Sequence, residues 1–171
     1  DYPLASHQRE IDLNCRAPLA LAHAFGAAMC QRHRGGIVLM SSIAGFQGGP
    51  FIANYAATRA YTATLAEGLW AEFGHQGVDV LACCAGATAT PGLTASDYQR
   101  PGRFAPPTTS PADVAREALD ALGSRPSHVP GAANRLANPP RGIRAELEAA
   151  AVVELLDRAH QTQIAFLDQV E

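Results

Sequence analysis

Apolar residues form two kinds of run along the first half of the chain, and their order predicts helices and strands in turn. Residues 6–34 carry apolar side chains at mixed helical spacings, which predicts a helix with a kink or restart at Pro18. The unbroken apolar run at 36–41 predicts a strand buried on both faces, as in a parallel sheet. A second long helix is predicted at about 52–75, and a second buried strand at 78–84.

The order helix, strand, helix, strand is typical of βαβ units and predicts an α/β fold with a parallel sheet and crossover helices. A long segment rich in Gly, Pro and Thr follows at 85–110. Ser110, a following proline and an acid in the first turn predict a helix that ends near residue 123. A short edge strand at 127–129, a proline-interrupted connector at 134–141 and a terminal helix at 143–168 complete the prediction.

Composition limits the classes of partner. The 171 residues are 47% hydrophobic and 17% charged, which is typical of one globular domain. A net charge of −3 with scattered histidines gives no basis for nucleic acid or a membrane surface as a partner, and no apolar run approaches the roughly 20 residues of a membrane span. The four cysteines lack the spacing of a zinc site, so we expect no metal and small buried thiols in a reducing cytoplasm.

Candidate chemistry gathers near the start of the second long helix. Tyr55 and Arg59 are four residues apart and therefore share a helix face. A fixed cation near a phenol lowers its pKa from about 10, so that it can exchange a proton with a carbonyl or alcohol oxygen. Ser42 follows a predicted strand, where ligands gather in βα units, and can hydrogen-bond the same oxygen. Asn14, within the first helix, can hold a water or a backbone carbonyl.

Four segments resemble, in order and spacing, the Asn, Ser, Tyr-x-x-x-Lys and Pro-Gly-x-x-x-Thr elements of short-chain dehydrogenase/reductases. They are Asp12-Leu13-Asn14, Met40-Ser41-Ser42-Ile43-Ala44-Gly45, Tyr55-Ala56-Ala57-Thr58-Arg59 and Ala85-Gly86-Ala87-Thr88-Ala89-Thr90. The resemblance covers about residues 11–131. It implies a Rossmann-like, doubly wound parallel sheet whose N-terminal part, with the Gly-rich cofactor loop, is missing. Residues 1–171 then form a single partial domain, with a catalytic core at 1–131 and a helical extension at 132–171.

The resemblance also implies roles for the catalytic set. Tyr55 is the general acid/base, Ser42 orients the substrate carbonyl, and Asn14 holds a proton-relay water. Arg59 stands where the family has a lysine that contacts the nicotinamide ribose and tunes the tyrosine. The implied reaction is hydride transfer between a nicotinamide and the carbon of a carbonyl or secondary alcohol.

The cofactor implied is NADP or NAD, with NADP favoured although the residues that decide are not in this chain. Its contacts would be Tyr55 and Arg59 together with Gly86, Thr88 and Thr90. Phe46 and Gln47, with Tyr98 and Phe104, are candidates for the substrate pocket. In this family the two long helices commonly form a four-helix interface, so a homodimer or homotetramer is expected.

Each of these residues also has an ordinary interpretation. Tyr55 can be a partly buried helix residue, Ser42 a strand-end cap, Asn14 a kink-former beside Pro18, and the loop threonines and aromatics plain surface residues. An alternative function is therefore a truncated or degenerate homologue without catalysis, which binds or oligomerises through an exposed sheet edge or through the two long helices. Arg59 and the missing loop favour this alternative, because arginine does not release a proton in proteins.

Overall fold

A computed structural model describes residues 2–91, 93 and 108–137 of the chain. Within these residues a parallel sheet has the strand order β1-β2-β3. Strand β1 (Gly35–Ser42) pairs with β2 (Val78–Ala85), and β2 pairs with the short β3 (Ser127–His128). Both long strands and the short strand at the sheet edge are confirmed. Burial on both faces is confirmed for β2, but it is wrong for β1, which lies at the edge of the described sheet and carries the 49% exposed Met40. The predicted terminal helix at 143–168 and two candidate pocket residues, Tyr98 and Phe104, lie outside the described residues.

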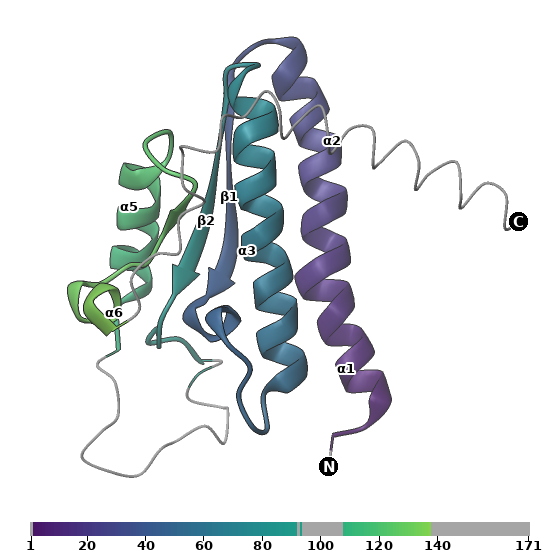
Figure 1. Ribbon diagram of the computed structural model, residues 1–171, viewed down its shortest axis with the longest axis vertical. Coiled ribbons are helices and arrows are strands. Elements are labelled where there is room, and N and C mark those ends of the chain that lie inside the picture. The colour runs from purple at the N-terminus through teal and green to yellow at the C-terminus, as the bar shows by residue number, and fades with distance from the viewer. Residues whose placement is uncertain (1, 92, 94–107, 138–171) are drawn as a thin grey trace, which may run out of the picture. The chain divides into compact units, whose positions relative to one another are not determined.

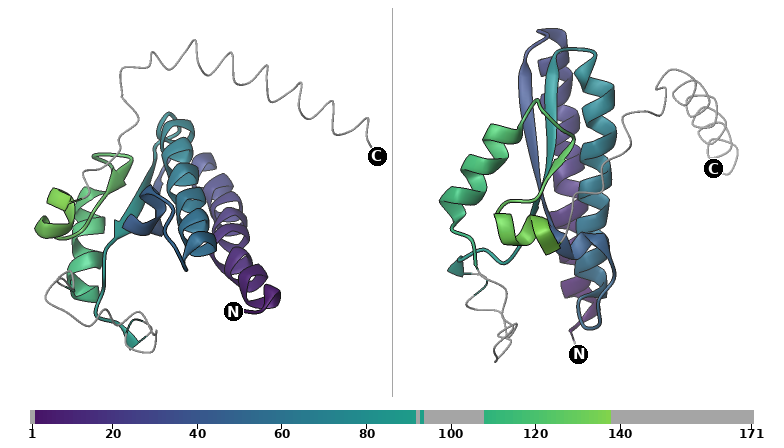
Figure 2. Two further views of the ribbon diagram at one scale, coloured as in Figure 1. Left: turned by 60° about the horizontal axis from the view of Figure 1, so that its bottom comes forward. Right: turned by 60° about the vertical axis from the view of Figure 1, so that its left-hand side comes forward.

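Helices cover both faces of this sheet, as the views of Figures 1 and 2 show. On one face lie α2 (Ala17–Gln31) and α3 (Ala53–Gly74), and on the other lies α5 (Pro111–Ala121). Helices on both faces of a parallel sheet make the fold a doubly wound, Rossmann-like α/β fold, as predicted.

The first predicted helix consists of three pieces. Helix α1 (Leu4–Ile11) runs through the π-helical turn η1 (Asp12–Arg16) into α2. In η1 the N–H of Ala17 donates to the carbonyl of Asp12, five residues back. The irregularity predicted at Pro18 therefore lies just before it, and Pro18 itself occupies the first turn of α2 without breaking the helix.

The residues at which α5 and α6 begin can be compared with the helix and the connector predicted for this part of the chain. Helix α5 begins as predicted, because the Ser110 hydroxyl accepts a hydrogen bond from the Asp113 N–H at 3.1 Å. The connector predicted from residue 134 is wrong, since α6 (Ala132–Ala137) occupies its start. The prolines that motivated the connector begin only at residue 139, and Gly131, with a left-handed φ of 85°, turns the chain into α6.

Strand β2 forms the centre of the core, because its side chains alternate between two buried clusters. Those on the α3 side are Val80, Ala82 and Cys84, and those on the α5 side are Leu81, Cys83 and Ala85. The two adjacent cysteines thus point to opposite faces, as expected. Burial raises the pKa of the Cys83 thiol to about 11 and that of the Cys84 thiol to about 12.

Strand β1 has no strand partner on its other side within the described residues. A groove of about 400 Å³ follows this edge, between β1 and the helices that precede it. Leu21 and Phe25 of α2 line it with 55% and 58% of their surfaces exposed, and Met40 of β1 is 49% exposed. Within the described residues this edge of β1 is therefore both unpaired and apolar.

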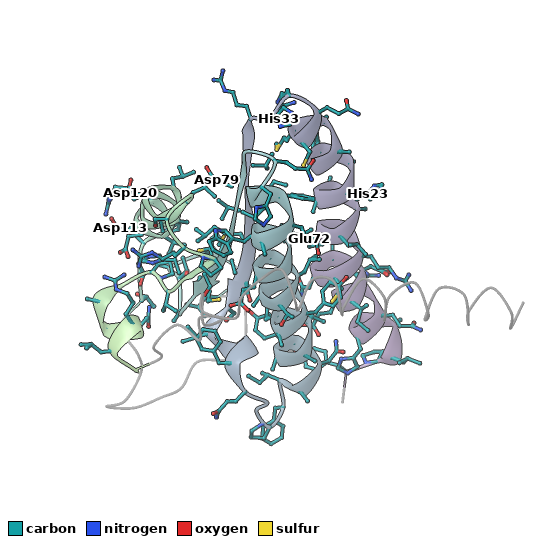
Figure 3. The ribbon with its side chains drawn as sticks, turned by 45° about the horizontal axis from the view of Figure 1, so that its top comes forward. His23, His33, Glu72, Asp79, Asp113 and Asp120 are labelled. Atoms are coloured by element: carbon teal, nitrogen blue, oxygen red, sulfur yellow. The ribbon has the colours of Figure 1, made fainter. Side chains whose placement is uncertain are left out.

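Several polar side chains lie on outer surfaces of the described part. Figure 3 shows Asp113 and Asp120 on α5, and His23 on α2. Among the described residues no group of three or more His, Cys, Asp or Glu could hold a metal ion. None of the described helices is long and apolar enough to cross a membrane.

Candidate active site

The carboxyl ends of β1 and β2 lie side by side, with Ser42 opposite Ala85 in the register. Ligands of parallel α/β proteins bind at this end of the sheet. The 3-10 turn η2 (Ile43–Phe46) leaves β1 here, and the segment 86–90 leaves β2. The fold therefore brings the predicted serine and the predicted cofactor segment to one end of the sheet.

Asn14 is tied to α3 by hydrogen bonds from both its side chain and its backbone. Its Nδ2 donates to the Thr58 hydroxyl at 3.0 Å, and that hydroxyl donates to the Tyr55 carbonyl at 2.8 Å. The Thr62 hydroxyl donates to the Asn14 carbonyl at 2.7 Å. Asn14 and the backbone of Tyr55 are therefore joined through a single side chain, although they lie far apart in the sequence.

The two threonines are site residues that sequence reasoning did not single out. Thr58 and Thr62 are buried, with exposed fractions of 3% and 0%. Their signal in the sequence is a pair of hydroxyls four residues apart, which places both on one face of α3. Without knowledge of what packs on that face, such a pair is typical of any helix.

Proline explains why the Asn14 carbonyl is available to α3. In an α-helix this carbonyl would accept the N–H of residue 18, and Pro18 has none. The Thr62 hydroxyl satisfies it instead. Asn14 lies inside the π-helical turn, and such turns occur frequently at functional sites. The water-holding role of Asn14 stays a prediction.

The guanidinium of Arg59 lies over the ring of Tyr55, with Cζ 5.0 Å from the ring centroid. This distance is within the range of a cation–π contact, and it confirms that the two side chains share a helix face. One Nη of Arg59 also donates to the Met40 carbonyl at 2.9 Å. Its Nε is buried and has no hydrogen-bond partner among the described residues. A buried donor without a partner is costly, so this atom is available to an acceptor on a ligand.

Ser42 is held close to α3 by contacts of the residues on either side of it. The neighbouring Ser41 hydroxyl donates to the Arg59 carbonyl at 2.7 Å, and the Ser42 hydroxyl accepts from the Ala44 N–H at 3.2 Å. A Cβ on Gly45 would lie 2.7 Å from the Ala60 nitrogen, so only glycine allows η2 to approach α3 this closely. Ser42 thus caps the turn after its strand, and its catalytic role stays a prediction.

The segment after β2 is held by the backbone of Thr109. The Thr109 N–H donates to the Ala87 carbonyl at 2.9 Å, and its carbonyl accepts from the Ala89 N–H at 3.0 Å. Within the segment, the Thr88 hydroxyl donates to the Gly86 carbonyl at 3.0 Å. The loop predicted to lie beside the nicotinamide therefore has a defined shape.

The candidate substrate residues Phe46 and Gln47 have different surroundings. Phe46 packs against the buried cluster on the α3 side of the sheet, whereas Gln47 is exposed. Phe51, which the sequence did not single out, is fully exposed with a φ of 66°, an uncommon backbone conformation for a bulky residue. The substrate roles of Phe46 and Gln47 stay predictions.

The fold and the position of the site at the carboxyl end of the strands define a Rossmann-like α/β domain. The pattern of the short chain dehydrogenase family matches residues 1–100. The chain belongs to the short-chain dehydrogenase family.

Known members of the family are similar to this chain over most of its length. A 7beta-hydroxysteroid dehydrogenase of Clostridium sardiniense is 31% identical over 135 residues, which are 79% of this chain and 51% of that protein. The solved structure of a bulky-bulky ketone specific alcohol dehydrogenase from Comamonas testosteroni is 26% identical with a TM-score of 0.60, over 96% of this chain and 56% of that one.

A third relative contains a bound cofactor. It is a protein from Beutenbergia cavernae whose solved structure carries the name "putative NAD(P) dependent gluconate 5-dehydrogenase" and holds NADP at low occupancy. It is 32% identical with a TM-score of 0.53, over 56% of this chain and 38% of that one. The chain spans about half the length of the curated relatives that it matches.

Proposed function

We propose that this chain supplies the catalytic part of an NAD(P)-dependent carbonyl reductase or secondary-alcohol dehydrogenase. The observation that carries the proposal is the hydrogen-bonded connection from Asn14 through Thr58 to Tyr55, next to the Arg59 guanidinium. Two relatives are named for a hydroxysteroid and for bulky ketones, which supports a secondary alcohol or its ketone as the substrate class.

The chain's own residues account for the proton in this reaction. The Ser42 hydroxyl would donate a hydrogen bond to the substrate carbonyl oxygen and fix its position. The Tyr55 phenol would give its proton to that oxygen during reduction, and would take one from the alcohol in the reverse direction. Asn14 would hold the water through which Tyr55 recovers its proton. The Arg59 charge over the ring supports a developing phenolate.

The residues at this end of the sheet fit a nicotinamide cofactor. The buried Arg59 Nε has no partner among the described side chains and backbone, and it can donate to a ribose hydroxyl together with Tyr55. Gly86, Thr88 and Thr90 would line the nicotinamide. When bound, the nicotinamide supplies the hydride for reduction or accepts it in oxidation. NADP is favoured over NAD by the relative that binds it.

The test is a fluorescence titration of the 171-residue protein with NADPH, followed by NADPH consumption with a bulky secondary ketone. We expect a saturable change on titration and consumption that depends on the ketone. A linear, non-saturable response at all concentrations would contradict the proposed function.

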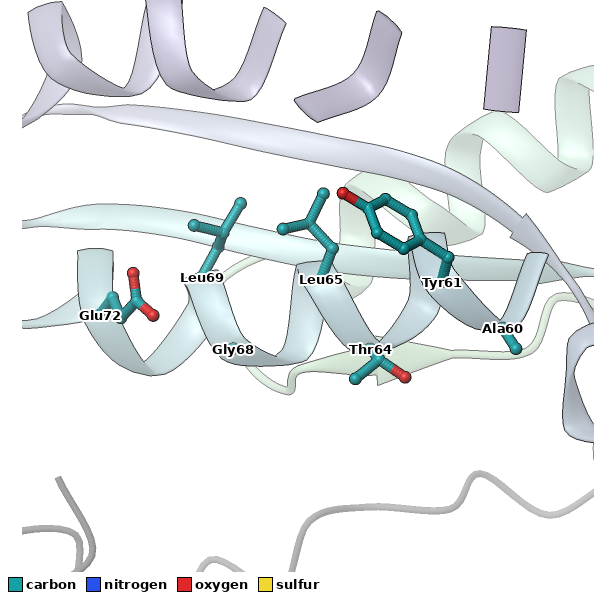
Figure 4. Close-up of a pocket in the computed structure, with 7 residues that line it drawn as sticks. All are labelled: Ala60, Tyr61, Thr64, Leu65, Gly68, Leu69 and Glu72. Atoms are coloured by element: carbon teal, nitrogen blue, oxygen red, sulfur yellow. The ribbon is translucent and has the colours of Figure 1, made fainter. Parts of the chain in front are cut away.

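We also propose that the functional form is a homodimer or homotetramer that packs through α2 and α3. A shallow groove of about 510 Å³ follows the outer side of α3, and Tyr61, Leu65 and Leu69 project along it (Figure 4). Apolar side chains at a spacing of four form one stripe of a helix, which suits packing against a second helix.

The alternative function is a binding or oligomerisation module without catalysis. It is favoured by the apolar edge of β1, which has no strand partner in the part of the chain that the structure describes and has Leu21, Phe25 and Met40 exposed beside it. This function predicts that the protein self-associates or captures a β-strand, and that it does not bind NADPH. The titration above therefore separates the two functions.

The substitution Arg59→Lys is expected to raise kcat for ketone reduction roughly tenfold, equivalent to about 1.4 kcal/mol in the barrier. Lysine keeps the positive charge, but it can also pass protons to water, which arginine cannot do. We expect the affinity for NADPH to change less than kcat. The control is Arg34→Lys, at an exposed arginine remote from Tyr55. An unchanged or lower kcat in the Arg59 variant would contradict the proton-relay explanation.

A further inference from the structure

A buried asparagine of α6 packs directly against the start of the predicted cofactor segment. Asn134 is 6% exposed, and a Cβ on Gly86 would lie 2.5 Å from its Nδ2 and 2.7 Å from its Oδ1. Its Nδ2 donates to the Pro130 carbonyl at 3.0 Å and lies 3.5 Å from the Thr109 hydroxyl. Asn134 therefore contacts both Gly86 and the residue whose backbone holds the segment 86–90.

A carboxylate on α5 anchors the helix that carries Asn134. Glu117 accepts hydrogen bonds from the Arg135 guanidinium and, at 3.2 Å, from the Gly131 N–H, and His128 Nε2 lies 3.2 Å from it. Arg135 also donates to the Val129 carbonyl at 3.1 Å. Burial alone would raise the pKa of Glu117, but these hydrogen bonds outweigh it and hold the pKa below its ordinary value of 4.5. At neutral pH the anchor is therefore charged, and it fixes both Gly131 and α6.

We infer that Asn134, anchored by Glu117, is a positioning residue that holds the segment 86–90 in the shape that receives the nicotinamide. The inference rests on the proposed function, because that function makes Gly86, Thr88 and Thr90 cofactor contacts. Asn134 would touch neither substrate nor cofactor. It acts through Gly86 and Thr109, so its loss alters cofactor affinity more than proton transfer by Tyr55.

The test compares Asn134→Ala with Leu136→Ala, an 87% exposed position on the same helix. For Asn134→Ala we expect the dissociation constant for NADPH to rise roughly tenfold, which corresponds to a loss of about 1.4 kcal/mol of binding free energy. We expect kcat at saturating NADPH to stay within about twofold of the parent. Amide hydrogen exchange without NADPH should accelerate at Ala89, whose N–H is bonded to Thr109, but not in β2. Leu136→Ala should change neither quantity.

Several outcomes distinguish this inference from the proposed function. If the parent protein fails to bind NADPH, the proposed function is wrong, and the exchange rate at Ala89 alone then supports or contradicts the positioning role. Unchanged NADPH affinity together with unchanged exchange at Ala89 in the Asn134 variant overturns the inference. If Asn134→Ala does not fold, Glu117→Gln replaces it, since this substitution keeps the side-chain shape and removes the charge that holds Arg135. It should give the same two changes, and their absence overturns the inference.

Discussion

Replacing Tyr55 with phenylalanine is expected to lower kcat for ketone reduction by about 10²–10⁴-fold, the usual contribution of a general acid or base. The substitution removes one hydroxyl and keeps the ring under the Arg59 guanidinium. The phenol oxygen makes no hydrogen bond to any described residue, and the bond from Thr58 goes to the Tyr55 backbone carbonyl. We therefore expect the melting temperature to stay close to that of the parent. The affinity for NADPH should fall much less than kcat, because the phenol is only one of the proposed contacts to the cofactor.

The matched control for this variant is Tyr61→Phe, which removes the same group from the same helix. Tyr61 is 40% exposed and lies on the outer side of α3 (Figure 4). Removing the Tyr61 hydroxyl should leave kcat within about twofold of the parent, because no proton transfer passes through this hydroxyl and the apolar ring that lines the proposed packing surface is kept. Steady-state rates and thermal melts are measured for the parent, Tyr55→Phe and Tyr61→Phe. A Tyr55 variant that keeps more than a tenth of the parental kcat would remove the phenol from the mechanism.

Substituting alanine for Gly45 is expected to destabilise the protein by about 1–3 kcal/mol, as overpacking typically does. The new Cβ would lie 2.7 Å from the Ala60 nitrogen and 2.8 Å from the Arg59 carbonyl carbon. Both are backbone atoms of α3, which cannot swing away as a side chain can. The turn after β1 must therefore move out, and Ser42 moves with it, so kcat should fall as well.

Gly48 provides a control for this effect within the same loop, since a Cβ there would have no heavy atom within 4 Å. Gly48→Ala should leave stability and kcat near the parental values. Denaturant unfolding measures the first quantity, and steady-state reduction of a ketone measures the second. Equal stability of the two variants would mean that η2 and α3 are not in tight contact.

Most of the fold could be predicted because the strands are apolar on both faces. Continuous apolar runs at β1 and β2, each preceded by a long helical segment, leave few arrangements other than a parallel sheet. The start of α5 was also predictable, because Ser110 and the proline after it are a local capping signal. Helix α6 was not, because its place depends on Glu117 and Arg135, which are distant in the sequence and meet only in the folded chain.

Part of the candidate site could be predicted from spacing alone. The spacing of four from Tyr55 to Arg59 fixes a shared helix face, but it does not fix the side-chain conformation that brings the guanidinium to the Met40 carbonyl. The threonines that join Asn14 to α3 could not be identified, since their partner comes from a separate helix. Local sequence patterns therefore predict the helices and strands, whereas contacts between distant segments decide which polar groups form hydrogen bonds.

The π-helical turn at Asp12–Arg16 also sets the helical phase of everything before it. One additional residue in a turn rotates the preceding segment by about 100° relative to an uninterrupted α-helix. Helix α1 meets α3 where the Asn54 amide donates to Glu10. This face of α1 therefore differs from the face that would meet α3 if α1 and α2 were one uninterrupted α-helix. Alignments that treat residues 4–31 as one regular helix will assign the wrong α1 side chains to this contact, and a single-residue deletion in the turn would rotate α1 away from α3.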